Sequence, residues 1–158
     1  MKILLPVDGT ELSLHETRFA LRLLAEGLRA SFVLANVQAA ASFYEIITAK
    51  DPALIEGAAQ EAGGDLMAPS ARLLDAAGVD YETAVITGDP ANAMLDLIEL
   101  HGCDMVVMGS RALGPIRRMM EGGSTSRRLL DESPVPVLLV KPPQPVDPDL
   151  DEDASNGA

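Results

Sequence analysis

Residues 109–126, GSRALGPIRRMMEGGSTS, have the composition of an anion-binding loop. Glycines stand near both ends of the segment, and Ser124, Thr125 and Ser126 would occupy the first turn of a following helix. Glycine permits close approach of the backbone, while free N–H groups at a helix start point outward beside the hydroxyl donors. The segment therefore predicts a binding site for phosphate oxygens.

The charge of this segment opposes that of the whole chain, whose net charge is −12. Between positions 110 and 128 the basic residues are Arg111, Arg117, Arg118, Arg127 and Arg128, with Glu121 as the acid among them. From charge, we expect Arg111 and Arg118 to add to the phosphate site. The alternative is that Ile116, Met119 and Met120 pack a short helix onto the domain while the arginines are solvated or pair with an acidic tail.

Two well-known phosphate-binding motifs are absent. Gly109 and Gly114 have the spacing of a P-loop, but Pro115 stands where that loop needs lysine. The turn DGTELS, which starts at Asp8, lacks the G-x-G-x-x-G of dinucleotide-binding proteins. The sequence thus disfavours NAD and FAD.

The sequence places no catalytic group convincingly. The two histidines, His15 and His101, fall inside predicted helices, and Cys103 is expected to be a small buried side chain at the start of a strand. Metal-ligand spacing of His and Cys is also missing. We expect no enzyme, or at most slow hydrolysis of a bound phosphate ligand that relies on Asp8 or bound water.

Short apolar runs alternate with segments of helical period, which is typical of an α/β protein with a parallel sheet. The predicted strands are 2–7, 31–37, 79–87, 104–108 and 135–140. The predicted helices are 12–28, 51–77, one that starts at Asp89-Pro90 and ends at Gly102, and 123–131. Because Pro136 lacks an N–H group, the last strand should lie at an edge of the sheet or begin after the proline.

Ligands of open parallel sheets bind beyond the carboxyl ends of the strands. Asp8, Val37 and Gly109 stand at such ends in this prediction, so we expect them to converge. Asp8-Gly9-Thr10 also has a purely structural interpretation, since a strand-to-helix turn with an N-cap uses the same residue types.

Composition predicts one domain and excludes several partners. The 158 residues carry 24 acids against 12 bases, which argues against nucleic acid, and no apolar run reaches the length of a membrane span. Because the sequence shows no signal-peptide pattern, we expect a cytoplasmic protein. We predict a folded domain at 1–142 and a disordered acidic tail at 143–158, where five acids stand without a base.

The motif PVDGT, the glycine-bounded loop and the closing run SPVPVLLVK together resemble the universal stress protein family over residues 1–142. The resemblance implies a three-layer, Rossmann-like (flavodoxin-like) fold whose five parallel strands have the order 3-2-1-4-5. It also implies a homodimer through the last strand, Val135–Val140. One branch of the family binds ATP and carries the motif G-x2-G-x9-G-[ST].

This chain departs from that motif. Gly109 takes the first glycine position, but Ala112 stands at the second. Counted forward from Gly109, the third glycine is Gly122; counted back from Pro136-Val137, Gly123-Ser124 fill the last two positions with one residue inserted. We prefer the second alignment because it brings Leu129 and Leu130 onto apolar helix positions.

The resemblance implies a site residue by residue. Val7 and Asp8 would meet the adenine or ribose, Val37 the adenine, Met108 and Gly109 the ribose–phosphate region, and Gly123, Ser124 and Thr125 the phosphates. The implied function is a dimeric stress-response regulator that binds ATP or a related adenine nucleotide, with or without Mg²⁺, and acts on an unknown protein client. The alternative is a dimeric interaction module of the same family that holds no nucleotide.

Overall fold

Five parallel strands form a sheet in the order β3-β2-β1-β4-β5, which confirms the predicted fold. The computed structural model describes residues 1–38, 52–110 and 125–143. The strands are β1 (Lys2–Pro6), β2 (Ser31–Gln38), β3 (Tyr81–Thr87), β4 (Met105–Gly109) and β5 (Val137–Val140). The helices are α1 (Glu11–Ala25), α3 (Pro52–Ala76), α4 (Pro90–His101) and α6 (Thr125–Glu132).

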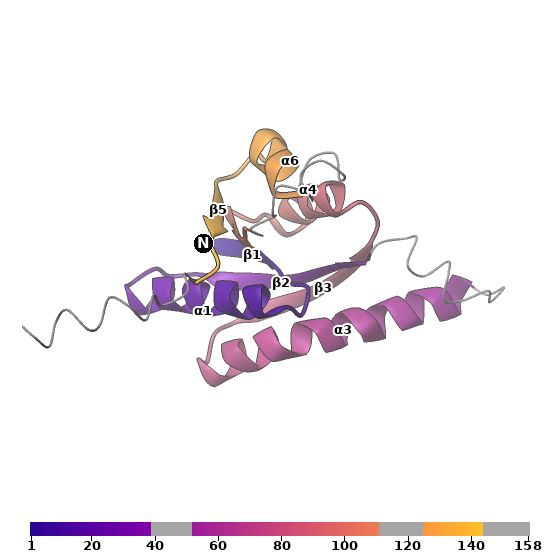
Figure 1. Cartoon of the computed structure of the whole chain (residues 1–158), viewed down its shortest axis with the longest axis horizontal. Coiled ribbons are helices and arrows are strands. Elements are labelled where there is room, and N and C mark those ends of the chain that lie inside the picture. The colour runs from indigo at the N-terminus through magenta and orange to yellow at the C-terminus, as the bar shows by residue number, and fades with distance from the viewer. Residues whose placement is uncertain (39–51, 111–124, 144–158) are drawn as a thin grey trace, which may run out of the picture.

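The helices cover both faces of the sheet. Figure 1 shows α1 and α3 on one side and α4 and α6 on the other. Since side chains alternate between the faces of a strand, neighbouring residues feed two separate cores. Ile3 and Leu5 pack toward α1 and α3, whereas Leu4 packs toward α4 with Leu97 and Leu129.

The glycines of α3 do not interrupt the helix. The helix runs for 25 residues and contains Pro69. Gly63 lies directly against β3, where an added Cβ would come within 2.6 Å of Val85 Cγ1. At this position glycine therefore allows the helix to approach the sheet closely.

Several predicted boundaries were wrong by one to three residues because helix ends close with their own hydrogen bonds. Leu28 donates its N–H to the carbonyl of Leu23, so α1 ends at Ala25. Val79 likewise donates to Leu74, and β3 begins at Tyr81. At the other end of the chain β5 begins at Val137, after the proline, and lies at the sheet edge.

The short helix α6 begins at Thr125 and corrects one argument from the sequence. Leu129 is fully buried as expected, but Leu130 has 48% of its surface exposed. The pair therefore does not support the preferred alignment of the glycine motif.

Three predicted segments lie outside the described residues: the connection 39–50, the loop 111–124 and the tail from 144 onward. In the part of the chain that is described, none of the helices is both long enough and apolar enough to cross a membrane.

Candidate nucleotide site at the carboxyl edge of the sheet

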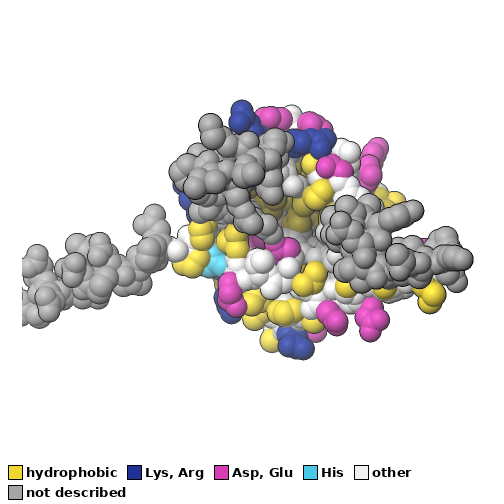
Figure 2. Space-filling view, turned by 45° about the vertical axis from the view of Figure 1, so that its right-hand side comes forward, with side chains coloured by type: hydrophobic (Ala, Val, Ile, Leu, Met, Phe, Trp, Pro, Cys, Tyr) yellow, Lys and Arg dark blue, Asp and Glu magenta, His cyan; other side chains and the backbone are white. Residues whose placement is uncertain are grey.

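The carboxyl ends of β1 and β4, which lie side by side, define the candidate site. α1 leaves β1 on one face of the sheet and α4 precedes β4 on the other, so this is a point where the connections diverge. Asp8 follows β1, Val37 lies near the end of β2, and Met108 and Gly109 end β4. Figure 2, which turns the right-hand side of Figure 1 forward, shows the surface hollowed between two grey segments, with acidic and hydrophobic side chains at its base.

The remaining predicted site residues divide into two groups. Thr125 begins α6 on the α4 side of the sheet and is partly exposed. Outside the described residues lie Arg111, Ala112, Gly122, Gly123 and Ser124. The structure thus places the part of the predicted site that would meet adenine and ribose.

Asp8 is fixed by the turn that follows it. Its Oδ1 accepts hydrogen bonds from the Thr10 N–H at 3.1 Å, from the Thr10 hydroxyl at 2.6 Å and from the Ser13 hydroxyl. Its own N–H donates to Ser13 Oγ at 3.0 Å. Thr10 is also the N-cap of α1, and Gly9 has a φ of 77°, in the left-handed region. The turn therefore has the structural role considered for it, and it also holds the Asp8 carboxylate at the strand end.

Val7 satisfies its polar groups within the protein. Its N–H donates to the Ala35 carbonyl at 2.7 Å, and its carbonyl accepts from Asn36 Nδ2 at 2.7 Å. Gln38 in turn donates to Asn36 Oδ1 at 2.6 Å. The Val7 side chain is only 4% exposed and packs in the core beneath α1 and α3. Val7 thus contributes to the site indirectly, because its backbone hydrogen bonds hold the end of β1 against β2.

Val37 presents its backbone differently. Alternate residues of a strand turn their N–H and C=O groups to the same side. The Ala35 carbonyl accepts the Val7 N–H on the β1 side of β2, so the backbone groups of Val37 also face that side. They lie beyond the end of β1 at Pro6. A backbone donor and an acceptor from one residue therefore point toward the space beyond β1.

Glu16 is the residue of this edge that the sequence analysis missed. Its side chain is 3% exposed, and its Oε2 accepts the Gly109 N–H at 2.7 Å. Its Oε1 is buried and has no hydrogen-bond partner among the described residues. Burial raises the pKa of Glu16 to about 9, against a smaller lowering by the Gly109 N–H. The carboxyl group is therefore neutral at physiological pH.

Helical spacing gave a signal that could have identified Glu16. Ser13, Thr17 and Ala20 all lie on the buried face of α1. Glu16 stands three residues after Ser13 and four before Ala20, which places it on the same face. An acid at such a position must be buried unless the helix rotates.

Gly109 lies directly on α1. A Cβ at this position would come within 2.7 Å of Leu12 Cγ and 3.1 Å of Glu16 Oε2. Any side chain here would force the side chains of Leu12 and Glu16 to shift, so packing as well as the family motif favours glycine.

Arg128 belongs to the contact between α4 and α6. Its guanidinium donates to Asp89 Oδ1 and to Asn92 Oδ1, both at 2.9 Å, and to Glu132 at 3.4 Å. Asp89 is the N-cap of α4, and its pKa is lowered first by the Asn92 N–H and then by Arg128. This arginine is therefore not simply solvated, because it joins α6 to the start of α4.

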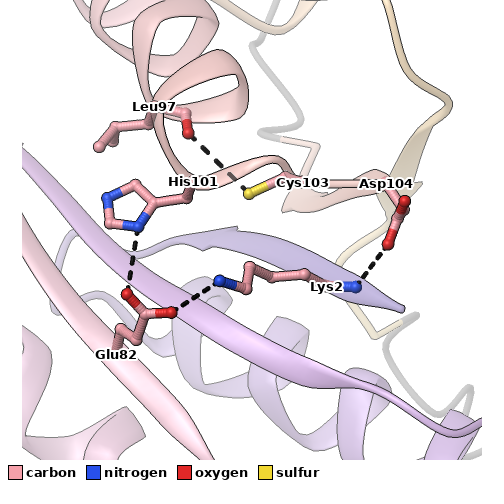
Figure 3. Close-up of polar contacts among 6 residues, drawn as sticks. All are labelled: Lys2, Glu82, Leu97, His101, Cys103 and Asp104. Carbon is pink, nitrogen blue, oxygen red and sulfur yellow. Dashed lines mark hydrogen bonds and ion pairs between the residues drawn. The ribbon is translucent and has the colours of Figure 1, made fainter.

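The opposite edge of the sheet carries an exposed charge cluster, drawn in Figure 3. Lys2 Nζ lies 2.8 Å from Glu82 Oε1, and His101 Nδ1 lies 3.3 Å from Glu82 Oε2. The hydrogen bond from Lys2 lowers the pKa of Glu82. Cys103 is buried, as expected, and burial raises the pKa of its thiol. Among the described residues there is no group of three His, Cys, Asp or Glu side chains that could hold a metal ion.

A comparison with known families identifies relatives of this chain. The model of the Universal stress protein family matches residues 1–141. The chain belongs to this family. Universal stress protein MJ0531 of Methanocaldococcus jannaschii is 27% identical over 143 residues, which cover 90% of this chain and 83% of the relative. A universal stress protein of Thermus aquaticus is 40% identical over 65 residues, which cover 40% of this chain and 47% of that protein.

Solved structures of two universal stress proteins and of the hypothetical protein MJ0577 share the fold. A family member from Arabidopsis thaliana with AMP bound has a TM-score of 0.65 and 20% identity, with 94% of this chain and 98% of that chain covered. A universal stress protein in complex with cAMP has a TM-score of 0.63 and 20% identity, with 89% and 95% covered. MJ0577 has a TM-score of 0.69 and 21% identity, with 91% and 97% covered.

Proposed function

We propose that this universal stress protein binds an adenine nucleotide at the carboxyl edge of its sheet and acts as a cytoplasmic, dimeric stress-response regulator. The observation that supports the site is that the Asp8 turn, the Val37 backbone and Gly109 stand at the carboxyl ends of the three neighbouring strands β1, β2 and β4. We choose an adenine nucleotide as the ligand because two family members have structures with AMP and with cAMP bound.

Val37 is suited to the base. Adenine presents an amino donor beside a ring-nitrogen acceptor, and a backbone C=O with its N–H offers the complementary pair. Met108 and Val37 both line the face of the sheet toward α4, where they supply apolar surface for the ring. The base would thus lie beyond β1, between the ends of β2 and β4.

Asp8 is suited to the ribose, because a fixed carboxylate accepts strongly from hydroxyl groups. Phosphates would then extend past Met108 and Gly109 toward Thr125 at the start of α6, with Gly123 and Ser124 as further donors. Mg²⁺, if present, would arrive with the triphosphate of ATP. The protein need supply no catalytic base for this role.

Calorimetric titration with AMP, cAMP and ATP, with and without Mg²⁺, tests the proposal. Asp8→Asn keeps the size of the side chain but removes its charge, and we expect affinity to fall about ten- to a hundredfold. The matched control is Glu82→Gln, which removes a carboxylate at the opposite edge and should leave affinity unchanged. No heat with any of the three nucleotides rejects the proposal, and equal losses in both variants place the ligand elsewhere.

One observation favours the alternative function, a family member that holds no nucleotide. The Gly109 N–H, the first backbone donor of the family motif, is already bonded to Glu16. Under this alternative the edge serves protein contacts, and the wild-type chain gives no heat with nucleotide while remaining a dimer.

For the dimer, we propose pairing through β5. The carbonyls of Pro136 and Val140 accept from β4, so Val137 and Leu139 turn their backbone groups outward, where a second chain can pair. Light scattering should give about twice 16.7 kDa. Leu139→Pro removes one outward donor and should yield a monomer, whereas Leu100→Gln, at a side chain 76% exposed elsewhere, should not. A dimeric Leu139→Pro variant would refute pairing at this strand.

A further inference from the structure

Glu16 is not explained by the proposed site contacts, although it is the acid buried deepest at this edge. A buried polar atom without a partner costs free energy, so such a group persists where it serves a purpose beyond packing. Glu16 has one oxygen in use and one without a partner among the described residues. The oxygen in use holds the last residue of β4.

Among the described residues, those around the carboxyl group are uncharged. β4 contributes the Gly109 backbone, and α1 itself contributes Leu12. From α3, the Ser70 hydroxyl accepts a hydrogen bond from the hydroxyl of Thr17, the residue that follows Glu16. β5 contributes Val140 to the core beside Ala20. Asp8, the acid of the preceding turn, is engaged by Thr10 and Ser13.

We propose that Glu16 is a proton-controlled positioning residue of the nucleotide site: as a neutral acid it fills the gap between α1 and β4 and fixes Gly109, and on ionisation it leaves this gap. The inference rests on the proposed function for its consequence, because Gly109 at the end of β4 is one of the residues that would line the nucleotide site. It predicts that nucleotide affinity depends on a residue that does not touch the nucleotide.

The physical reason is that no residue in the described part of the chain compensates the charge of an ionised Glu16. A carboxylate in this place would keep the Gly109 N–H but would leave its second oxygen charged and unsolvated, which is far more costly than a neutral hydroxyl. Ionisation therefore drives the side chain toward water, and Gly109 loses both a partner and the group against which it packs.

Titration of AMP between about pH 7 and about pH 10 provides the test, since the second pKa of a phosphate monoester is about 6 and the AMP phosphate is mostly a dianion over this range. Wild-type affinity should fall about tenfold for each pH unit above the pKa of Glu16. Glu16→Gln, which keeps an acceptor for Gly109 and cannot ionise, should bind like the wild type at pH 7 and lose the pH dependence. Glu16→Ala should bind weakly at every pH. A purely packing role predicts no pH step, and a step retained in Glu16→Gln overturns the inference.

Adenosine separates positioning from repulsion. If ionised Glu16 merely repelled the phosphate, adenosine affinity would not change with pH. We expect adenosine to show the same step as AMP, because the position of Gly109 affects the whole site.

A measurement without ligand keeps this inference distinct from the proposed function. The amide NMR resonance of Gly109 should shift with pH in the wild type, with a midpoint near the pKa of Glu16, and should not shift in Glu16→Gln. Gly102, which caps α4 at the other edge, is the control resonance. An unresponsive Gly109 amide overturns the inference, whereas a responsive amide in a chain that binds no nucleotide refutes only the proposed function.

Discussion

The two edges of the sheet carry acids of opposite character. Glu82, at the amino edge, has 54% of its side chain exposed and pairs with Lys2 and His101. Glu16, at the carboxyl edge, is buried and receives a single backbone N–H. The pKa of Glu82 is lowered by hydrogen bonds and nearby charge, and the pKa of Glu16 is raised by burial.

The difference shows how the environment, and not the residue type, sets the chemistry of a carboxyl group. Water screens the charges of the amino edge, so its ion pairs contribute little to stability. At the carboxyl edge the protein replaces water, so a missing partner has a large effect. A functional site is therefore better sought at Glu16 than at the more conspicuous cluster around Glu82.

The largest effect should come from Gly109→Val. The new side chain would collide with Leu12 and Glu16, and we expect a loss of about 3 kcal/mol or more in the free energy of unfolding. Gly64→Ala is the matched control, because no atom lies within 4 Å of its Cβ position, and it should stabilise α3 by about 0.5–1 kcal/mol. Denaturant unfolding measures both. Equal stability of wild type and Gly109→Val would show that α1 and β4 are not packed as described.

Glu16→Gln should stabilise the fold at neutral pH. Because the folded pKa lies above the unfolded value of 4.5, the stability of the neutral group is complete below about pH 4.5 and is lost as the pH rises toward about 9. At pH 7 this difference corresponds to about 3 kcal/mol, and we expect a net gain of about 2 kcal/mol because the glutamine N–H groups also lack partners.

Unfolding of wild type and Glu16→Gln at several pH values gives the measurement. The advantage of the variant should shrink between pH 7 and about pH 5. A constant difference would mean that Glu16 does not titrate in this range, and the contrast between the two edges would then lose its basis.

Ser13→Ala should have an intermediate effect. The Ser13 hydroxyl is buried, donates to Asp8 and accepts the Asp8 N–H, so its removal leaves polar groups unpaired at a cost of about 1–2 kcal/mol. Chemical unfolding measures the loss. Thr10→Ser, which preserves the capping hydroxyl, should be close to neutral, and a comparable loss there would show that the hydroxyl hydrogen bonds are not the cause of the effect.

Glu82→Gln should have the smallest effect. Both partners of this carboxylate are at least partly exposed, and the variant should unfold at nearly the wild-type temperature. Since the pKa of Glu82 is lowered in the fold, any contribution it makes is present above its unfolded pKa and disappears as the pH falls. Thermal unfolding at low and high salt tests this, and a marked salt-dependent loss would sharpen the role of the amino edge.

The sequence by itself determined the order of the elements, the parallel sheet and the strand ends that carry Asp8, Val37 and Gly109. Apolar runs, helical periods and turn residues are local signals, and they sufficed for N-caps such as Asp89 and for the start of β5 after Pro136. The family motif supplied the strand order, which local signals do not contain.

Only the tertiary structure decided what surrounds each side chain. Leu130 follows the helical period yet remains exposed, because α6 is short and packs through Leu129. Glu16 and Gly109 are 93 residues apart along the chain, and only the packing of α1 on β4 joins them. Burial is a property of the assembled fold, so the proton on Glu16 could not be predicted from the residues that precede and follow it.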